Sequence, residues 1–199
     1  RTLPASIRYC LGALPRDMDM PLVAALSPLI GALATAVRLR YLARVNGINL
    51  SPFIAGDSGS NKGALTDIIM CWSQPLRQQD APLLAAEEEW RQAKQKVGSS
   101  AKEQPAKPQG VIRCPTVNST LPQLCRRLGS TGGKHAFSYS EEADEFTARM
   151  SGCMTDISTM QRKAYDGAAY ERETVGAEGV NVHIPQLPWN TVFAGTNDA

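Results

Sequence analysis

The stretch SPFIAGDSGSNKGAL, residues 51–65, decides the fold that we expect for this chain. Residues 52–55 are a short apolar run typical of a strand, small residues follow, and Lys62 opens a run with helical spacing. Backbone N–H groups can surround a phosphate only where side chains are small, and a lysine ammonium at the helix start then meets the outer phosphates. We therefore predict a phosphate-binding loop, whose residues are Gly56, Asp57, Ser58, Gly59, Ser60, Asn61, Lys62 and Gly63.

This loop departs at two positions from the P-loop pattern G-x-x-x-x-G-K-[ST]. Asn61 stands where glycine is usual, a mild change because asparagine tolerates left-handed backbone angles. Gly63 stands where a serine or threonine hydroxyl normally holds Mg²⁺. Ser58, Ser60 or a water are candidates to replace that hydroxyl. The alternative interpretation of the stretch is a plain Gly/Ser connector before a helix.

Length and composition predict one soluble globular domain. The chain has 199 residues, of which 43% are hydrophobic and 20% charged, and its net charge of +2 neither demands nor excludes a nucleic-acid partner. Five scattered cysteines form no C-x-x-C pair, so we expect no zinc-finger-type site and reduced thiols in a cytoplasmic protein. Because the chain starts at Arg1 and stops directly after a strand-like run, we expect a piece of a longer protein.

Residues 21–37, PLVAALSPLIGALATAV, invite a membrane prediction. The segment is short for a span of about 20 residues and is rich in alanine rather than leucine. Three arginines follow it and favour the carboxyl end of a helix dipole: Arg38, Arg40 and Arg44. We predict a buried helix over residues 20–42, and no membrane partner; a membrane span is the alternative.

The rest of the chain alternates strands with helices. Strands are predicted at residues 48–55, 111–114, 135–139 and 190–195, a turn at Asn46-Gly47, and a hairpin at residues 170–175 and 180–183. Helices are predicted at residues 63–72, 82–97, 118–128, 141–150 and 156–165, a short helical piece at residues 7–14, and a mobile loop at residues 98–110. This order indicates an α/β fold with a parallel central sheet flanked by helices. Residues 1–45 are expected to be an N-terminal helical segment packed on a core of residues 46–199.

Two further strands end in polar residues that could complete a site. The run HAFSYSEE, residues 135–142, ends in two glutamates, which fit the roles of Mg²⁺ holder (Glu141) and polariser of the attacking water (Glu142). The last predicted strand ends in Thr196 and Asn197, either of which could orient the lytic water. The alternatives are acids that stabilise a helix N-terminus and a plain core strand that ends in a polar turn.

Taken together, these motifs resemble the helicase-like P-loop proteins found beside primases in bacterial mobile elements. The resemblance lies in SPFIAGDSGSNKG, the Glu-rich run with Glu89-Trp90, SEEADEF (140–146), KAYDGAAYERE (163–173) and PQLPWNTVFAGTND (185–198). It implies a RecA-like or AAA-type nucleotidase core that takes ATP and Mg²⁺ and works as a homo-oligomeric motor on DNA, single-stranded DNA included. Lys62, Glu141, Glu142 and Asn197 would carry over as phosphate, metal, catalytic and sensing residues.

Three functional hypotheses follow from the sequence. The first is an ATP-hydrolysing core of a primase-associated helicase. The second is a degenerate, non-hydrolysing P-loop module that serves as a scaffold or DNA-loading adaptor, and the third is a small-molecule phosphotransferase. Candidates for an arginine finger are Arg126, Arg127, Arg162 and Arg172, each of which has the alternative of being a solvated side chain. All three hypotheses expect the loop, the acidic strand and the polar-tipped strand to meet at one end of a parallel sheet.

Overall fold

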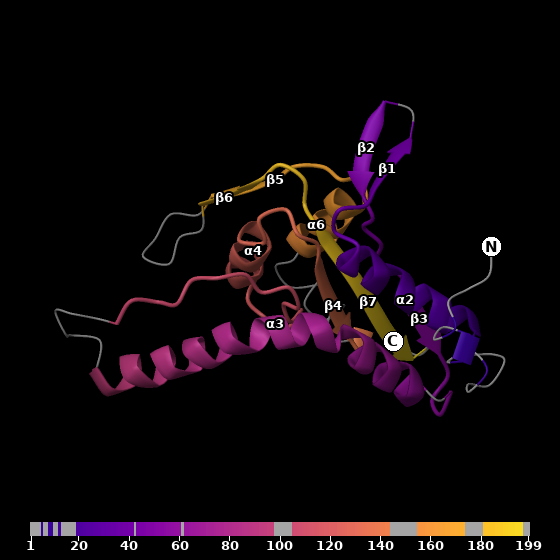
Figure 1. Cartoon of the computed structure of the whole chain (residues 1–199), viewed down its shortest axis with the longest axis horizontal. Helices are drawn as coiled ribbons and strands as arrows, with labels where there is room; N and C mark the ends of the chain where they lie inside the picture. Colours follow the sequence, from indigo (N-terminus) through magenta and orange to yellow (C-terminus); the bar gives the residue numbers. More distant parts are fainter. Residues whose placement is uncertain are drawn as a thin grey trace.

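The computed structural model describes residues 19–41, 43–60, 62–97, 105–143, 155–173 and 181–196, together with residues 5, 8, 9 and 12. Its elements in chain order are α2 (Asp19–Leu33), β1 (Arg38–Tyr41), β2 (Arg44–Gly47), β3 (Phe53–Gly56), α3 (Lys62–Val97), α4 (Leu121–Gly129), β4 (Ala136–Ser140), α6 (Thr155–Tyr165), β5 (Tyr170–Glu173), β6 (Asn181–Ile184) and β7 (Trp189–Thr196). Figure 1 shows α3 running along most of the length of the molecule, with the sheet above the part nearer its N-terminus.

A three-stranded parallel sheet forms the centre of the fold. The last strand, β7, lies in the middle, with β3 on one side and β4 on the other. Gly56 pairs with Thr196, and Phe193 pairs with both Phe53 and Ser140. Because the strands are parallel, their carboxyl ends point toward the same edge of the sheet, although β4 ends three residues before β3 and β7. Strand β7 is buried along nearly its whole length, as expected for a parallel strand covered on both faces.

Helices cover both faces of this sheet. Val192 points to the face that packs against α2 and the first half of α3, where Leu29 and Ile69 are fully buried. Phe193, the next residue, points to the opposite face, where α4 and α6 contribute Leu128 and Met160. The structure therefore has mixed α/β architecture with a parallel sheet between helices, as the sequence predicts.

Helix α2 is buried on the sheet as predicted, but it is shorter than predicted. It ends at Leu33, and the chain then forms the β1–β2 hairpin, which projects from the body of the molecule (Figure 1). The predicted helix is therefore wrong beyond Leu33, and the predicted turn at Asn46-Gly47 lies inside β2. The physical reason is that the spacing of apolar residues changes from helical to alternating. Residues 38–41 alternate arginine with Leu39 and Tyr41, a pattern that suits an exposed β-strand.

One helix, α3, replaces the two that the sequence predicts around residues 63–97. It is 36 residues long and contains Pro75 and Pro82, and Figure 1 shows that it bends. Burial of Leu76, Asp80 and Glu87 along one face keeps the helix continuous past the second proline.

Residues 111–114, predicted as a strand, have no strand structure. The backbone N–H groups of Arg113 and Cys114 donate to the carboxylate of Asp80 instead of to a neighbouring strand. One backbone bond, from Phe137 N to Arg113 O at 2.8 Å, links the segment to β4.

The remaining elements match the sequence predictions. Helices α4 and α6, strands β4 and β7, and the antiparallel β5–β6 pair all form where expected. The predicted core strand over residues 48–55 is shorter as observed, although Leu50 and Pro52 already accept bonds from β7. The predicted helices at residues 7–14 and 141–150 lie largely outside the described residues. Of the loop predicted at residues 98–110, residues 98–104 lie outside them, and residues 105–110 form neither helix nor strand. Of the described cysteines, Cys71, Cys114 and Cys125 form no disulfide. Among the helices described none is long and apolar enough to cross a membrane.

Candidate functional site

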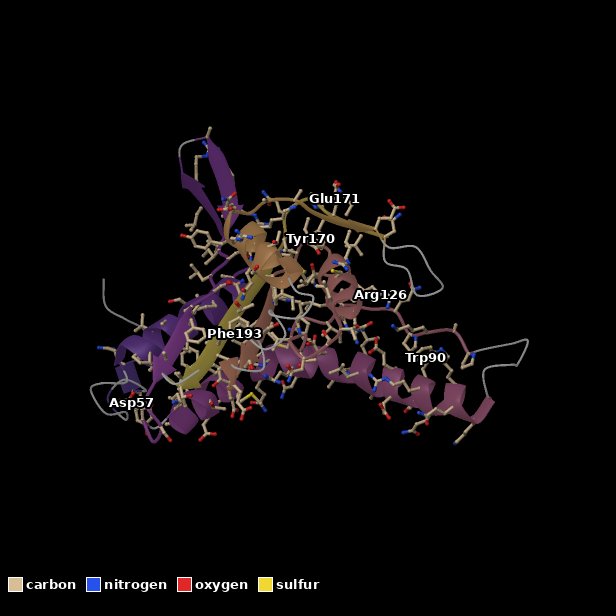
Figure 2. The ribbon with its side chains drawn as sticks, turned by 180° about the vertical axis from the view of Figure 1, so that it is seen from behind. Asp57, Trp90, Arg126, Tyr170, Glu171 and Phe193 are labelled. Atoms are coloured by element: carbon tan, nitrogen blue, oxygen red, sulfur yellow. The ribbon has the colours of Figure 1, made fainter. Side chains whose placement is uncertain are left out.

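A strand–loop–helix unit occupies one end of the sheet. Strand β3 ends at Gly56 beside Thr196, and α3 begins at Lys62, while Asn61 lies outside the described residues. Gly59 has a φ of +82°, in the left-handed region that favours glycine, and Ser60 N donates to Asp57 O at 3.1 Å to close the turn. Figure 2 shows Asp57 at the end of the molecule opposite Trp90. The small residues of the loop thus permit a tight turn directly before a long helix.

Lys62 folds back over this loop. Its ammonium donates to Gly56 O at 2.7 Å and to Asp57 O at 3.1 Å, and the side chain is half-buried. The first turn of α3 contains no acidic residue, so its unpaired N–H groups and positive dipole end face no carboxylate from that turn. The two carbonyls that hold the ammonium are neutral, and an anion at the loop could replace them.

Two positions in the loop show what it can accommodate. A Cβ at Gly56 would lie 2.7 Å from Ser60 Oγ, so a larger residue would displace the Ser60 hydroxyl. The Ser60 hydroxyl is buried and has no hydrogen-bond partner among the described residues, a state that a ligand or water would relieve. Gly63 has open space instead, with nothing within 4 Å of a Cβ built there. The side chains of Asp57 and Ser58 are exposed.

The two predicted glutamates follow β4 at the same edge of the sheet. Tyr139 and Thr66 share a hydroxyl–hydroxyl hydrogen bond of 2.6 Å, which ties the end of β4 to the turn of α3 that follows Lys62. Burial raises the pKa of Tyr139, and the nearby Glu141 carboxylate raises it further, although the bond to Thr66 acts in the opposite direction. Glu141 therefore lies near this phenol, and both glutamates are exposed.

The segment after the glutamates lies against the end of β7. A Cβ built on Gly195 would lie 2.9 Å from the Cβ of Ala143. Strands β3 and β7 end level with each other, whereas β4 ends three residues earlier, with Ser140 opposite Phe193. Residues 141–143 continue beside β7 toward the end that Lys62 follows, and Asn197 lies outside the described residues. In the described ranges, no three His, Cys, Asp or Glu side chains gather into a metal-binding group. Mg²⁺ bound with phosphates commonly takes only one or two carboxylates, with phosphate oxygens and waters as the other ligands.

A groove of about 1030 Å³ lies away from this edge. It opens between α2 and α6 beside Leu50 and Pro52, at the amino end of β3, and Tyr165 contributes to its largely apolar wall. Arg162 and Asp166 are its charged residues, so its charges balance. The groove therefore offers a phosphate no excess of positive charge.

Sequence reasoning missed two buried ionic groups. Asp80 accepts the N–H groups of Arg113 and Cys114, and the Arg113 guanidinium donates to Ala32 O at 2.6 Å and to His135 O at 2.8 Å. Glu87 forms a two-bond ion pair with Arg127 of α4, which occupies one of the candidate arginine fingers. Neither group has a sequence signature, because each joins residues that are far apart in the chain.

Comparison with known proteins identifies no relative: no family model, no curated protein and no solved structure matches this chain.

Proposed function

We propose that this chain is a nucleotide-binding domain of P-loop type that takes ATP with Mg²⁺ at the β3–α3 loop. The observation that carries the proposal is the position of Lys62, whose ammonium sits on two neutral carbonyls at the N-terminus of α3. Phosphate oxygens would replace those carbonyls with stronger, charge-assisted bonds, and the N–H groups of the loop and of the first helical turn would bind the same phosphates. The orphaned Ser60 hydroxyl is a further group for such a ligand.

The strand order supports a role for the acids. Because β7 lies between β3 and β4, the acidic strand is separated from the loop strand by two strand spacings, about 10 Å. A terminal phosphate, its Mg²⁺ and an attacking water would fill such an interval. Glu141 would hold the water shell of the metal, Glu142 would polarise the attacking water, and the end of β7 would orient it. With hydrolysis, the domain would serve as the core of an oligomeric, primase-associated, helicase-like DNA motor.

A specific observation favours a second candidate, a non-hydrolysing module that acts as a scaffold or DNA-loading adaptor. Gly63 supplies no hydroxyl to Mg²⁺, and the Thr66 hydroxyl one turn later is bonded to Tyr139. Such a domain would bind nucleotide with little help from the metal and would release no phosphate.

Titration with a fluorescent ATP analogue tests nucleotide binding. We expect Lys62→Ala to weaken binding at least tenfold, on the order of 1.4 kcal/mol, because it removes a charge-assisted bond. The matched control is Lys134→Ala, an exposed lysine away from the loop, which should leave affinity unchanged. Equal and negligible affinity in the wild type and in Lys62→Ala would remove the proposal.

Phosphate release and metal dependence separate the two candidates. A hydrolysing domain releases phosphate with Mg²⁺, and Glu142→Gln stops release but keeps binding. An adaptor releases none. Because the space at residue 63 is open, Gly63→Ser and Gly63→Ala both fit. We expect only the serine variant to gain Mg²⁺-dependent affinity; an equal gain in both would show that no metal ligand is missing at this position.

A further inference from the structure

Strand β3 leaves one edge of the central sheet open. It lies at the margin of the sheet, and β7 pairs with only one of its two edges (Figure 1). The backbone N–H of Leu50 bonds a side chain of β7, and the carbonyls of Leu50 and Pro52 accept backbone bonds from β7. Because these groups alternate along a strand, the N–H and C=O groups of Ser51, Phe53 and Ala55 face away from β7. None of them has a hydrogen-bond partner among the described residues.

This open edge has none of the usual protection against pairing with another chain. Edge strands are commonly guarded by charged side chains, by a proline in place of an outward N–H, or by a bulge. Residues 50–56, LSPFIAG, contain no charged residue, and their one proline turns its carbonyl toward β7. The register with β7 is continuous, and the aromatic side chain of Phe53 is 53% exposed. An open, uncharged and apolar edge is suited to receive a further strand.

The groove between α2 and α6 lies beside the amino end of this edge. Ser51 and Pro52 line it, with Ala24 and Ser27 of α2 on one side and Tyr165 of α6 on the other. Its volume of about 1030 Å³ is at the upper end for sites that bind ligands. Its charged residues are one arginine and one aspartate, so it has no excess of either charge. The groove therefore suits an uncharged chain with apolar side chains.

We propose that the open edge of β3 binds an extended peptide segment of a partner protein, which adds to the sheet as a fourth strand. The outward N–H and C=O groups of Ser51, Phe53 and Ala55 would bond the backbone of the peptide, as in β-strand addition to other exposed sheet edges. Side chains alternate across a strand, so the peptide would place one set over Ala24 and the other beside Tyr165. The partner that this edge fits is an uncharged segment with apolar residues at alternate positions.

The sides of the groove favour a lone peptide over a second copy of the whole chain. Residues of α2 and α6 lie on both sides of the edge. Paired strands are about 4.8 Å apart, whereas a helix with its side chains is about 10 Å across. Pairing of β3 with β3 would therefore press the helices of both copies against each other over the groove. A peptide carries no flanking helices and enters the groove without this conflict.

The inference goes beyond the proposed function and does not depend on it. The groove lies at the amino end of β3, whereas the phosphate loop follows its carboxyl end at Gly56. No residue from Gly56 to Gly63 lines the groove. Lys62→Ala should consequently lose nucleotide and keep the peptide.

Fluorescence anisotropy of a labelled synthetic peptide tests the inference with the whole chain. The probe has about eight residues, a common strand length, which alternate valine and threonine between blocked ends. N-methyl groups on alternate amides leave it one edge for pairing and prevent it from forming larger sheets with itself. The matched control peptide is N-methylated on every amide and offers β3 no donor. We expect the control to bind at least tenfold more weakly than the probe, because its backbone bonds are lost.

Two substitutions in the chain test the edge and the groove separately. Phe53→Lys places a charge at the open edge, and Tyr165→Ala removes an apolar side of the groove. These side chains are 53% and 65% exposed, so both variants should keep melting temperatures within a few degrees of the wild type. We expect each to weaken peptide binding about fivefold or more. The matched control Met70→Lys alters an exposed apolar residue that does not line the groove, and should bind within about twofold of the wild type.

Amide hydrogen exchange, followed by NMR, distinguishes strand addition from a general apolar contact. The amide protons of Ser51, Phe53 and Ala55 should exchange at least tenfold more slowly with the peptide bound, whereas that of Ile54, which faces β7, should not change. The inference is overturned if the probe does not bind, if the fully methylated control binds equally well, or if these three amides keep their exchange rates. It is also overturned if the chain alone forms a dimer that Phe53→Lys separates, because a second copy would then occupy the edge.

Discussion

The substitution Asp80→Ala tests the buried network that holds residues 112–115 in place. The Asp80 side chain is 1% exposed, and its two oxygens accept Arg113 N at 2.8 Å and Cys114 N at 2.7 Å. The segment that these bonds fix supplies Ile112, Cys114 and Pro115 to the wall of a hollow of about 560 Å³ that Trp90 also lines. Loss of the carboxylate should therefore lower stability and loosen that wall.

The size of the effect follows from the loss of two hydrogen-bond acceptors and of one nearby negative charge. Two N–H groups, that of Arg113 buried and that of Cys114 part-buried, lose their acceptors, at a cost of about 1–3 kcal/mol for a buried group. Arg113, which is 7% exposed, also loses its nearby negative charge. For a buried charge left without its partner, the expected total is about 3–5 kcal/mol. In a chain of this size that corresponds to a fall in melting temperature of roughly 6–20 °C.

Urea unfolding of Asp80→Ala beside Asp67→Ala measures this effect. Asp67 is an exposed acid on the same helix, and its loss should stay within about 0.5 kcal/mol. The Cys114 thiol supplies a local readout: burial, helped by the Asp80 charge, raises its pKa to about 12. Without Asp80 this pKa falls and the segment loosens, so alkylation of Cys114, followed by mass spectrometry, should accelerate. A loss below about 1 kcal/mol with an unchanged alkylation rate would refute the reasoning.

Three further outcomes are expected. Glu87→Ala removes the ion-pair partner of the Arg127 guanidinium, whose side chain is only 13% exposed. The free energy of unfolding, measured in urea, should fall by about 3–5 kcal/mol. Replacing both residues with methionine should restore much of that stability. Gly59→Ala should cost about 1–2 kcal/mol of thermal stability because of its positive φ, with a parallel loss of nucleotide affinity. Burial, together with the charges of Arg38 and Arg113, lowers the pKa of His135 in the folded chain. As the pH falls, this imidazole is therefore protonated in the unfolded chain before it is protonated in the folded chain. The free energy of unfolding should consequently decrease below about pH 6.5. Urea unfolding from pH 7 to 5.5 should show this slope in the wild type and in His183→Gln, and a smaller slope in His135→Gln.

Some of the fold could be predicted because its signals are local. Strand β3, its loop and the start of α3 are contiguous, and the composition of that stretch alone predicts strand, turn and helix. The apolar runs of β4 and β7 likewise predicted buried strands of a parallel sheet. Prediction failed where a tertiary contact overrode the local signal: Asp80 removes residues 113 and 114 from strand pairing, and burial on both sides of Pro82 keeps α3 whole.

The candidate sites also combine features that the sequence predicts with features that only the tertiary structure shows. Residue types and spacing by themselves predicted the phosphate loop, because small side chains and a lysine that adjoin in the chain are what such a loop requires. Only the tertiary structure decided that β7 lies between β3 and β4, and that α2 and α6 line a groove beside the open edge of β3. Glu87 and Arg127 are 40 positions apart, and nothing within either segment encodes the other. Bringing such distant residues together costs chain entropy, which is offset only by burial of the whole core. These contacts therefore depend on the complete fold and not on any single stretch of sequence.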